Sequence, residues 1–514
     1  MLRQQTNQVA VPPMDRYNQK LVENLHPPQW INPKPASCYN LVVIGGGTAG
    51  LVTAAGAALF GAKVALVEKH LLGGDCTNVG CVPSKTMIRS ARAVAAVKQA
   101  KQYGVTVSGV AVDFSAVMER LRRIRAQISE NDSAQHMAEE YGVQVFLGEG
   151  RFLDRQTVAV ADQKLRFKKA VIATGSSPVK LPIDGLESVG YLTNETVFSL
   201  TQRPQRLVVI GGGYIGCELA QTFQRLGSQV TLLQKSSRLL TSTEAEAAQI
   251  VEQALRREGV NVILKAETQQ VAATDGKQVT YRVDGQLSSV TADEILVAVG
   301  RSPHVQGLSL EQVGVEYSAK QGININEYLQ TSNPRIYAVG DVAMQSKFTH
   351  AADAAARIVI QNALFAPFGI GRKKLSTLTI PWCTYTQPEI AHVGISAQEA
   401  EERAANLDTF CVPMDDIDRA VIDGETAGFT KIYLKKGTDK ILGATIVAAQ
   451  AGETINVITL AMQKELGLGA IAATIFPYPT QAEIVRKVAD AYSLSRFTPA
   501  IKKLASIWLQ LRRR

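Results

Sequence analysis

An α/β fold class is predicted for this chain by three observations. A β-branched run that ends in Gly-x-Gly-x-x-Gly and continues as a helix occurs twice, at 41–50 and 207–216. The 514 residues are enough for three or four domains, and 46% hydrophobic with 20% charged residues is ordinary for a globular protein. Short β-branched runs at 431–434 and 441–447, with a helix at 453–466, indicate a mixed C-terminal domain. We therefore predict two Rossmann-like domains followed by an α+β domain.

The first 38 residues are expected to form an N-terminal arm. They carry charges throughout and lack the apolar core of a signal peptide, and the proline-rich part at 26–35 predicts an ordered or semi-extended segment. The following stretch, 41–62, contains no charged residue but six glycines. Such glycines break or weaken a helix in lipid, so we interpret 41–62 as a buried strand, a glycine turn and a packed helix.

The first glycine loop predicts a dinucleotide site. Gly45, Gly47 and Gly50 let the backbone approach a pyrophosphate at the start of the following helix. Glu68 lies 23 residues after Gly45, where a carboxylate can accept hydrogen bonds from an adenosine ribose. This pattern suits FAD or NAD.

The second loop, with Gly211, Gly213 and Gly216, differs at its second strand. Gln234 stands at the offset of the carboxylate, and two cations follow it, Lys235 and Arg238. This site lacks the carboxylate that would repel a 2′-phosphate and gains charges that would attract one, so NADPH is favoured over NADH. The alternative is that these cations belong to a solvated loop.

Cys76 and Cys81 predict a redox disulfide. Thiols at this spacing can meet when 77–80 forms a distorted turn at a helix start, where the helix dipole stabilises a thiolate. A small structural disulfide or half of a zinc site are the alternatives, but no second Cys pair has comparable spacing. The remaining cysteines are scattered singly, at Cys38, Cys217, Cys383 and Cys411. Few thiols in a long chain favour a cytoplasmic location, with Cys383 and Cys411 expected in the core.

The net charge of +9 is concentrated at the C-terminus, because 491–514 contains six basic residues and no acidic one. The rest of the chain shows no basic face interleaved with aromatics, so we expect no nucleic-acid partner. The tail has apolar residues at helical spacing, namely Ile501, Leu504, Trp508 and Leu511. It could lie on an anionic membrane or an acidic partner, or form a solvated or self-docked terminal helix.

Further motifs accompany the glycine loops and the Cys pair: 173–176 (Ala-Thr-Gly-Ser), 299–303 (Val-Gly-Arg-Ser-Pro) and 336–341 (Ile-Tyr-Ala-Val-Gly-Asp). With them the chain, from 39 to 487, resembles the pyridine nucleotide-disulfide oxidoreductases, the family of glutathione reductase, dihydrolipoamide dehydrogenase and mercuric reductase. The resemblance implies a homodimer with FAD in the first nucleotide domain and NADPH in the second. It also implies further cofactor-binding residues, namely Asp341 and Gly340 at the flavin's ribityl chain, Thr174 and Gly175 on the adenine side, and Gly300 at the domain junction.

The same resemblance implies roles around the cysteines. Cys81 faces the flavin as the charge-transfer thiol, and Cys76 is the interchange thiol that meets the acceptor. Lys85, one helical turn beyond Cys81, lies beside flavin N5 and pairs with Glu218. Tyr214 covers the nicotinamide pocket or serves as a packing residue. Electrons pass from NADPH to FAD, to the disulfide and to the acceptor.

The choice of electron acceptor is expected to depend on Tyr478 and Glu483, which the family arrangement brings to Cys76 of the partner subunit. Disulfide reductases carry a histidine where this chain has Tyr478, and no histidine occurs after His392. A phenol with a pKa near about 10 is a poor general base at neutral pH, which makes glutathione and lipoamide weak candidates. Mercuric reductases carry a tyrosine in this region, and a soft metal held transiently by Cys76 and Cys81 needs no such base.

The expected function is therefore mercuric reductase-like reduction of Hg(II) or another thiophilic acceptor. We expect a departure from mercuric reductases proper, because the sequence shows neither their vicinal Cys pair near the C-terminus nor their N-terminal metal-binding domain. One alternative is a reductase of a small disulfide or a dihydrolipoamide dehydrogenase. A second alternative is a flavoprotein with mainly a binding or membrane-docking role.

The expected division of the chain has six parts, and within the second part 114–141 is expected to be mostly one long charged helix. The parts are an arm (1–38), an FAD domain (39–186), an NAD(P)H domain (187–305), a returning FAD segment (306–376), an interface domain (377–489) and a basic tail (490–514).

Overall fold

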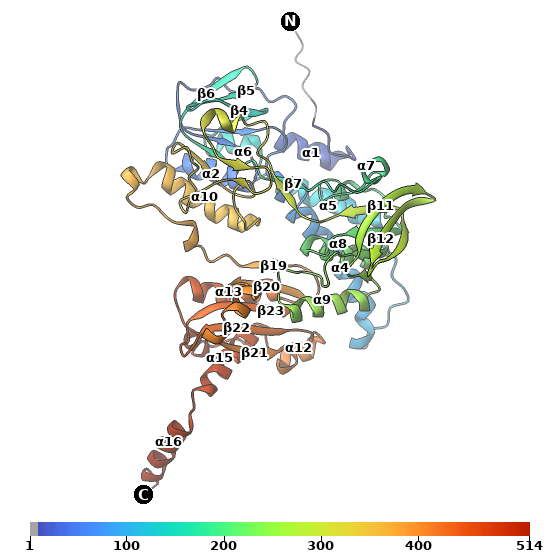
Figure 1. The fold of residues 1–514 in the computed structure, drawn as a ribbon, viewed down its shortest axis with the longest axis vertical. Coiled ribbons are helices and arrows are strands. Elements are labelled where there is room, and N and C mark those ends of the chain that lie inside the picture. The colour runs from blue at the N-terminus through green and yellow to red at the C-terminus, as the bar shows by residue number, and fades with distance from the viewer. Residues whose placement is uncertain (1–8, 514) are drawn as a thin grey trace. The chain divides into compact units, whose positions relative to one another are not determined.

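The computed structural model describes residues 9–513, which form two compact units (Figure 1). Unit 1 contains the chain up to Lys235 together with Lys265–Leu378, and unit 2 contains Ser236–Leu264 and the chain from Thr379 onward. The first eight residues of the predicted arm and Arg514 of the predicted tail lie outside the described residues.

The first sheet of unit 1 has the strand order β3-β2-β1-β6-β5-β4, with β18 also paired to β6. The strands β3, β2, β1, β6 and β18 run parallel, whereas β4, β5 and the start of β6 form an antiparallel meander. Alternate residues such as Val42, Ile44 and Ile172 fill a core beneath the sheet. The strands are β1 (Tyr39–Ile44), β2 (Val64–Glu68), β3 (Gln144–Leu147), β4 (Gly150–Asp154), β5 (Thr157–Val160), β6 (Gln163–Ile172) and β18 (Ile336–Ala338).

Two helices pack closely at this sheet, α2 (Thr48–Leu59) and α10 (Thr349–Leu364). Gly56 permits their approach, because a Cβ there would lie 2.6 Å from Ile360 Cδ1. Since α2 begins directly after β1 and α10 follows soon after β18, both helices start at the carboxyl ends of parallel strands, where α/β proteins bind nucleotides.

A second parallel sheet in unit 1 contains β9, β8 and β14 in that order, with α8 following β8. Beside it lies an antiparallel meander, β11-β12-β13, and the short strands β7 and β15 pair separately. The elements are β7 (Ser176–Pro178), β8 (Arg206–Ile210), α8 (Tyr214–Arg225), β9 (Gln229–Leu233), β11 (Glu267–Thr274), β12 (Gly276–Val283), β13 (Gln286–Ala292), β14 (Glu294–Val297) and β15 (Arg301–Pro303).

The remaining helices of unit 1 surround the Cys loop or connect the sheets. They are α1 (Arg16–Leu25), α3 (Gly74–Asn78), α4 (Cys81–Gln99), α5 (Phe114–Ile128), α6 (Ala134–Glu139) and α7 (Leu186–Val189), and a small hairpin is made by β16 (Tyr317–Ser318) and β17 (Gly322–Ile323).

Unit 2 is built on a five-stranded antiparallel sheet with the order β19-β20-β23-β22-β21. Its core joins the sheet to α13 and α15 through residues such as Ile446, Ile455 and Val485. The predicted runs at 431–434 and 441–447 are therefore strands. The elements are α9 (Ala245–Arg257), β10 (Asn261–Ile263), β19 (Trp382–Thr384), β20 (Glu389–Gly394), α11 (Ala397–Glu402), β21 (Leu407–Pro413), α12 (Asp418–Asp423), β22 (Phe429–Lys435), β23 (Ile441–Ala448), α13 (Ala451–Gln463), α14 (Leu468–Ala472), α15 (Glu483–Ser495) and α16 (Pro499–Leu511).

The helix expectations need three corrections. The stretch 114–141 is two helices, because Ser129 ends α5 and the side chain of Ser133 caps α6 by accepting from the His136 N–H. The expected helix 453–466 is α13, which ends at Gln463, before the left-handed Glu465 (φ 54°). The arm also contains a helix that its sequence did not predict, α1, whose first amides are capped by Asp15.

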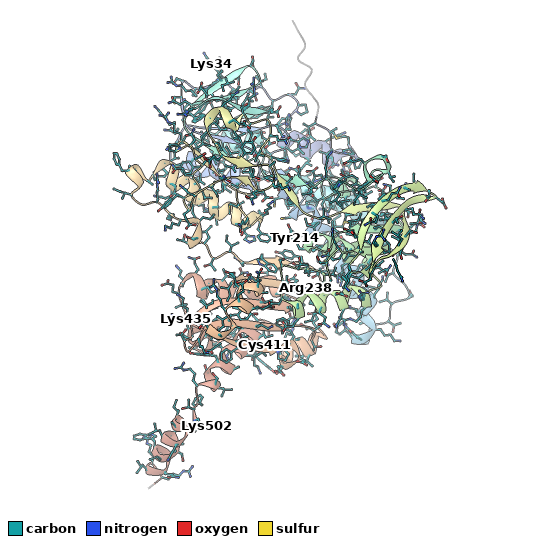
Figure 2. All side chains as sticks on the ribbon, viewed as in Figure 1. Lys34, Tyr214, Arg238, Cys411, Lys435 and Lys502 are labelled. Carbon is teal, nitrogen blue, oxygen red and sulfur yellow. The ribbon has the colours of Figure 1, made fainter. Side chains whose placement is uncertain are left out.

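The tail forms the helix α16, as its spacing predicts. All of its side chains are exposed, and Figure 1 shows it projecting from the end of α15. The self-docked alternative is therefore wrong for the described chain. Lys502, which lies in this helix, is labelled in Figure 2. No helix within 9–513 has both the length and the apolar character needed to cross a bilayer.

Candidate redox site

The Cys loop joins two consecutive helices: Cys76 lies in α3 and Cys81 is the first residue of α4. Gly80 makes the tight connection possible, since a Cβ there would lie 2.7 Å from the Asp75 carbonyl oxygen. The predicted turn at a helix start is therefore confirmed. It places Cys81 at the positive end of a 19-residue helix, where a thiolate is stabilised.

The two thiols differ in acidity. A hydrogen bond from Cys76, with further contributions from Thr349 and the Lys85 ammonium, outweighs burial and lowers the pKa of Cys81 to about 6. The Sγ atom of Cys81 lies 3.5 Å from Thr349 Oγ1. The hydrogen bond with Cys81 and burial raise the pKa of Cys76. Cys81 is thus the thiolate of the reduced pair at neutral pH, and Cys76 is the thiol that donates to it.

Lys85 and Glu218 form the expected ion pair, although 133 residues separate them. Lys85 Nζ donates to Glu218 Oε2 at 2.7 Å, from α4 to α8. The carboxylate side chain is only 4% exposed and the lysine 36%. A buried carboxylate needs a compensating cation, so this pair fixes Lys85 one turn along α4 from Cys81.

A second charge cluster next to the Cys pair was missed by sequence reasoning. Arg301 pairs with Asp75 at 2.7 Å and lies 3.4 Å from Asp341. Ser176 links the cluster, because its hydroxyl donates to Asp341 Oδ2 at 2.6 Å and accepts from Arg301 Nε at 2.8 Å. Burial, only partly offset by Arg301, raises the pKa of Asp75 to about 6. Asp75 and Arg301, which form the 2.7 Å pair, each belong to a motif recognised in the sequence, but nothing in the sequence indicates that they contact each other.

The first glycine loop has the form that its sequence predicts. Gly45 has φ 107°, and a Cβ on Gly50 would overlap the carbonyl oxygen of Gly45. Gly47 stands at the N-cap of α2, so no side chain caps the first amides of this helix. Glu68 lies at the end of β2 and accepts from the Gly46 N–H at 2.6 Å. An anionic pyrophosphate fits these open amides, with the carboxylate next to them for a ribose.

The second loop repeats this geometry. Gly211 has φ 110°, and a Cβ on Gly216 would overlap its carbonyl oxygen. Gly213 stands at the N-cap of α8, and nothing lies within 4 Å of where its Cβ would be. Gln234 takes the place of the carboxylate, since its Oε1 accepts from the Gly212 N–H at 2.9 Å. The two loops are equivalent nucleotide cradles that differ in charge.

The two cations after Gln234 already have partners. Lys235 pairs with Glu267 at 2.8 Å, and both side chains are largely exposed. Arg238 belongs to unit 2, where its guanidinium donates to backbone carbonyls of Leu240, Thr241 and Thr243. A 2′-phosphate would have to compete with Glu267 for Lys235.

Tyr214 begins α8 and is 39% exposed, with its ring 6.3 Å from that of Phe348. Burial raises the pKa of its phenol to about 12, so the group stays neutral. Thr174 donates from its hydroxyl to the carbonyl of His304 at 2.7 Å. Gly175, Gly300 and Gly340 all have positive φ, at 71°, 141° and 79°.

The acceptor-side residues lie in unit 2. Tyr478 is 70% exposed, and its hydroxyl donates to Asp418 Oδ2 at 2.8 Å. This hydrogen bond raises the pKa of Tyr478, which further weakens it as a base. Glu483 is the first residue of α15. Cys411 is exposed on β21 (Figure 2), contrary to the expectation that it is a core residue, because it lies on the outer face of an edge strand.

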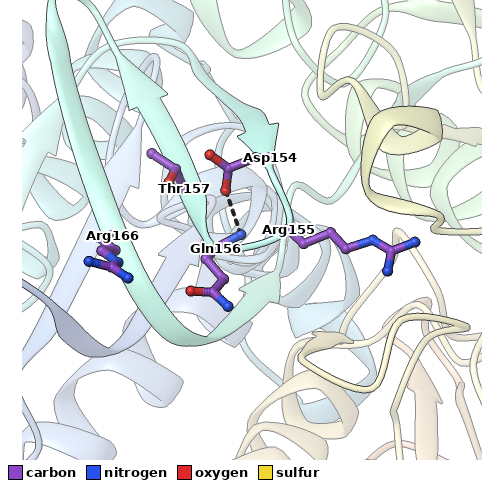
Figure 3. A pocket seen from close by; sticks show the side chains of 5 residues that line it. All are labelled: Asp154, Arg155, Gln156, Thr157 and Arg166. Carbon is purple, nitrogen blue, oxygen red and sulfur yellow. Dashed lines mark hydrogen bonds between the residues drawn. The ribbon is translucent and has the colours of Figure 1, made fainter.

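A shallow pocket at the β4–β5 turn has no part in this site. It is lined by Asp154, Arg155, Gln156, Thr157 and Arg166, none of which belongs to a nucleotide or redox motif (Figure 3). Among residues 9–513 there is also no cluster of three or more His, Cys, Asp or Glu side chains that could hold a metal ion.

Unit 1 alone supplies a thiolate at a helix start, a lysine close to it that is paired with a buried carboxylate, and two nucleotide cradles with uncapped helix amides. This combination defines an oxidoreductase that moves electrons between bound nucleotides and a cysteine pair. The chain belongs to the pyridine nucleotide-disulphide oxidoreductase family, whose model matches 39–356, and the family's dimerisation domain matches 380–489. It is accordingly an FAD- and NAD(P)H-dependent disulfide oxidoreductase, and the matched dimerisation domain supports a homodimer.

The chain is similar to known proteins over most of its length. A mercuric reductase from Staphylococcus aureus is 38% identical over 446 residues, which is 87% of this chain and 81% of that protein. A dihydrolipoyl dehydrogenase from Mycoplasma pneumoniae is 34% identical over 455 residues, covering 88% of this chain and 97% of the relative. Among solved structures, the Cu(II) complex of the flavoprotein disulfide reductase RclA from Escherichia coli has a TM-score of 0.78 at 26% identity, covering 89% of this chain and all of the other (100%).

Proposed function

We propose that this enzyme reduces Hg(II) or another thiophilic acceptor through Cys76 and Cys81, in a mercuric reductase-like reaction. The observation that carries the proposal concerns the acid–base catalyst of disulfide exchange: Tyr478 stands where a histidine would serve, and its hydroxyl is committed to Asp418. Similarity to mercuric reductases supports the same acceptor class. A soft metal ion needs only the thiolates as ligands.

In this proposal the two sulfurs act as metal ligands and as the electron exit. Bound FAD supplies hydride transfer from NADPH and two-electron delivery. Cys81, already a thiolate, and Cys76, which loses its proton on binding, hold Hg(II) as a dithiolate. Two electrons then reduce the ion to Hg(0), so that NADPH and Hg(II) yield NADP⁺, Hg(0) and one proton. Lys85, held by Glu218, keeps a positive charge close to the Cys pair. Asp418 holds the Tyr478 phenol in place by accepting its hydrogen bond.

The test is steady-state NADPH oxidation with Hg(II) in excess thiol, run beside glutathione disulfide and lipoamide at equal enzyme. We expect mercury-dependent turnover to exceed both disulfides by at least about tenfold, because the disulfides require the missing general base. Inhibition by mercury, with efficient turnover of lipoamide or glutathione disulfide, would instead assign the alternative function of a small-disulfide reductase. Cu(II) belongs in the same assay, since the RclA relative is described as a Cu(II) complex.

For the nicotinamide donor we propose a preference for NADPH, supported by Gln234 at the position of the ribose-binding carboxylate and by Lys235 after it. The expected result is a larger kcat/KM for NADPH than for NADH. Changing Gln234→Glu should reverse the ratio, since a carboxylate repels the 2′-phosphate and accepts from a 2′-hydroxyl. Equal kcat/KM values in the native enzyme would contradict the preference, and Lys265→Gln, on a nearby exposed lysine, serves as the control.

We further propose that α16 places the enzyme on an anionic membrane surface. Its apolar residues Ile501, Leu504 and Trp508 share one side, and Lys502 and Lys503 lie toward the other, with all of these side chains exposed. A basic amphipathic helix with a tryptophan suits a lipid interface. Pairing of two such tails would bring only positive charges together, since the sequence from 491 onward has no acidic residue.

Sedimentation with vesicles tests this placement. The full chain should sediment with phosphatidylserine vesicles and not with phosphatidylcholine, and removal of 497–514 should abolish it while leaving NADPH oxidation unchanged. Trp508→Gln should weaken binding at all salt concentrations, whereas Lys502→Gln should weaken it mainly at low salt. Equal sedimentation of the full and truncated chains would exclude a membrane role for the tail.

The proposed assembly is a cytoplasmic homodimer in which Tyr478 and Glu483 of one chain serve Cys76 of its partner. In each chain, the arm (1–38) comes first in the sequence. The FAD domain is formed by two segments (39–186 and 306–376), and the NAD(P)H domain (187–305) is inserted between them. The interface domain (377–489) supplies the dimer contact expected from the family match.

A further inference from the structure

The part of the arm that the structure describes is fastened to the Cys loop rather than to a distant surface. Arg125 of α5 is the largest fully buried side chain among the described residues, at 1% exposure. One end of its guanidinium, Nη1, donates to the carbonyl oxygen of Asn78 at 2.7 Å. The other end, Nη2, donates to the Asn18 side-chain oxygen at 2.7 Å. Asn78 ends α3, between the two cysteines, and Asn18 lies in α1 of the arm.

The buried guanidinium of Arg125 needs hydrogen-bond acceptors, because it has lost its contact with water. Neither of these two hydrogen bonds goes to a carboxylate, and within residues 9–513 Nε has no hydrogen-bond partner. Burial, together with repulsion from Arg122, lowers the pKa of Arg125 to about 10, so it remains charged at neutral pH. Each carbonyl acceptor therefore carries much of the compensation, and loss of one leaves a buried cation under-solvated.

Asn18 is itself held rigidly by the arm. Its amide nitrogen donates to the carbonyls of Val11 at 3.0 Å and Pro13 at 2.8 Å, so that the chain before α1 folds around it. Asp15, the N-cap of α1, adds an ion pair with Arg122 at 2.6 Å. The arm thus presents one fixed acceptor to Arg125 from outside the family core.

The opposite side of the Cys loop is also anchored. The Asn78 amide donates to the carbonyls of Leu72 at 2.9 Å and Gly74 at 2.8 Å. The Thr77 hydroxyl donates to Asp132 at 2.6 Å. The carbonyl of Asn78 stands at the end of a short helix, where the last carbonyl oxygens need hydrogen-bond donors from outside the helix. Arg125 therefore adds a buried contact to those that fix the segment between the cysteines.

We propose that the N-terminal arm is a working part of the redox site: Asn18 and Arg125 are positioning residues that hold the 77–80 turn and thereby set the reduction potential of the Cys76/Cys81 pair. A fixed turn keeps the two sulfurs close, so the pair forms its disulfide with little loss of chain entropy. When the turn is released, the disulfide loses this advantage and becomes easier to reduce. The inference concerns the protein's own thiols and does not depend on which acceptor the enzyme uses.

The experiment measures the reduction potential of the pair in the holoenzyme by equilibration with dithiothreitol buffers, with thiols counted by alkylation and peptide mass. Asn18→Leu, which removes the acceptor, should shift the dithiol–disulfide equilibrium toward the dithiol by about tenfold, or about 30 mV for this two-electron couple. Asn18→Asp keeps an acceptor for Arg125 but loses the donors to Val11 and Pro13, and should retain the native potential. Gln19→Leu is the matched control, since the side-chain amide of Gln19 donates to the Met14 carbonyl of the arm at 3.2 Å, in the same helix as Asn18.

A second variant, Arg125→Lys, keeps the proposal testable if Asn18→Leu does not fold. Arg125→Lys keeps the charge but has no planar fork to reach both acceptors, so the same shift is expected. A native potential in both Asn18→Leu and Arg125→Lys would overturn the proposal. A shift in Asn18→Asp equal to that in Asn18→Leu would also overturn it, because the arm's own turn, and not the contact with Arg125, would then be responsible.

Discussion

Cys81→Ser is expected to lower acceptor-dependent NADPH oxidation by about 10³-fold or more, because the redox-active thiolate and one metal ligand disappear together. Serine is nearly the size of cysteine and can still accept at Thr349, so the fold should persist. Reduction of the bound flavin by NADPH should continue at close to its native rate, since the nucleotide cradles are unchanged. Stopped-flow absorbance separates the two steps.

Cys411→Ser is the matched control, since that thiol is exposed, single and remote in sequence from every motif. The two thiols should also differ in pH dependence. In the reduced native enzyme, alkylation of Cys81 by iodoacetamide, followed by peptide mass, should rise through about pH 6, where the thiolate forms. Cys411 should react only at higher pH, since partial desolvation of its sulfur raises its pKa above the ordinary value of a thiol. Loss of flavin reduction in Cys81→Ser, or a Cys81 profile like that of Cys411, would contradict this assignment.

The sequence predicted those features that depend on local pattern. Glycine loops demand positive φ and close approach, so Gly45 and Gly50 could be assigned from the glycine spacing alone, and the spacing of the cysteines required a turn at a helix start. The Lys85–Glu218 pair was predicted only through family resemblance, because 133 residues separate the partners and neither has a distinguishing local pattern.

Other features depend on tertiary contacts between charges that look ordinary in sequence. Arg125 occurs among several arginines of α5, and nothing local says that it alone is fully buried. Asp75 and Arg301 stood in separate motifs, and their pairing follows from the return of the chain at β15 next to β7. The break between α5 and α6 did have a local signal, the Ser-Glu-Asn-Asp-Ser run at 129–133, whose residues favour turns and caps.

Lys85→Met should have the second large effect, on flavin reduction and on stability together. It leaves the Glu218 carboxylate, 4% exposed, without its cation, and breaking a buried pair in this way costs about 3–5 kcal/mol. Since Lys85 is itself partly exposed, we expect the lower end of that range, seen as a fall in the apoprotein's thermal midpoint. Loss of a fixed positive charge at the reduced centre should slow flavin reduction by about 10²-fold.

The double variant Lys85→Met/Glu218→Gln separates these two consequences. Replacing the carboxylate by a neutral amide removes the buried negative charge that Lys85 no longer balances, so most of the lost thermal stability should return. The rate of flavin reduction should stay low, because the cation is still absent. Lys85→Arg should preserve thermal stability and the rate of flavin reduction better than the single or the double variant. Lys98→Met, on an exposed lysine at the last turn of α4, should change neither of these two quantities. If the double variant reduced flavin at the native rate, Lys85 would be a structural partner of Glu218 and not an electrostatic contributor to the reaction.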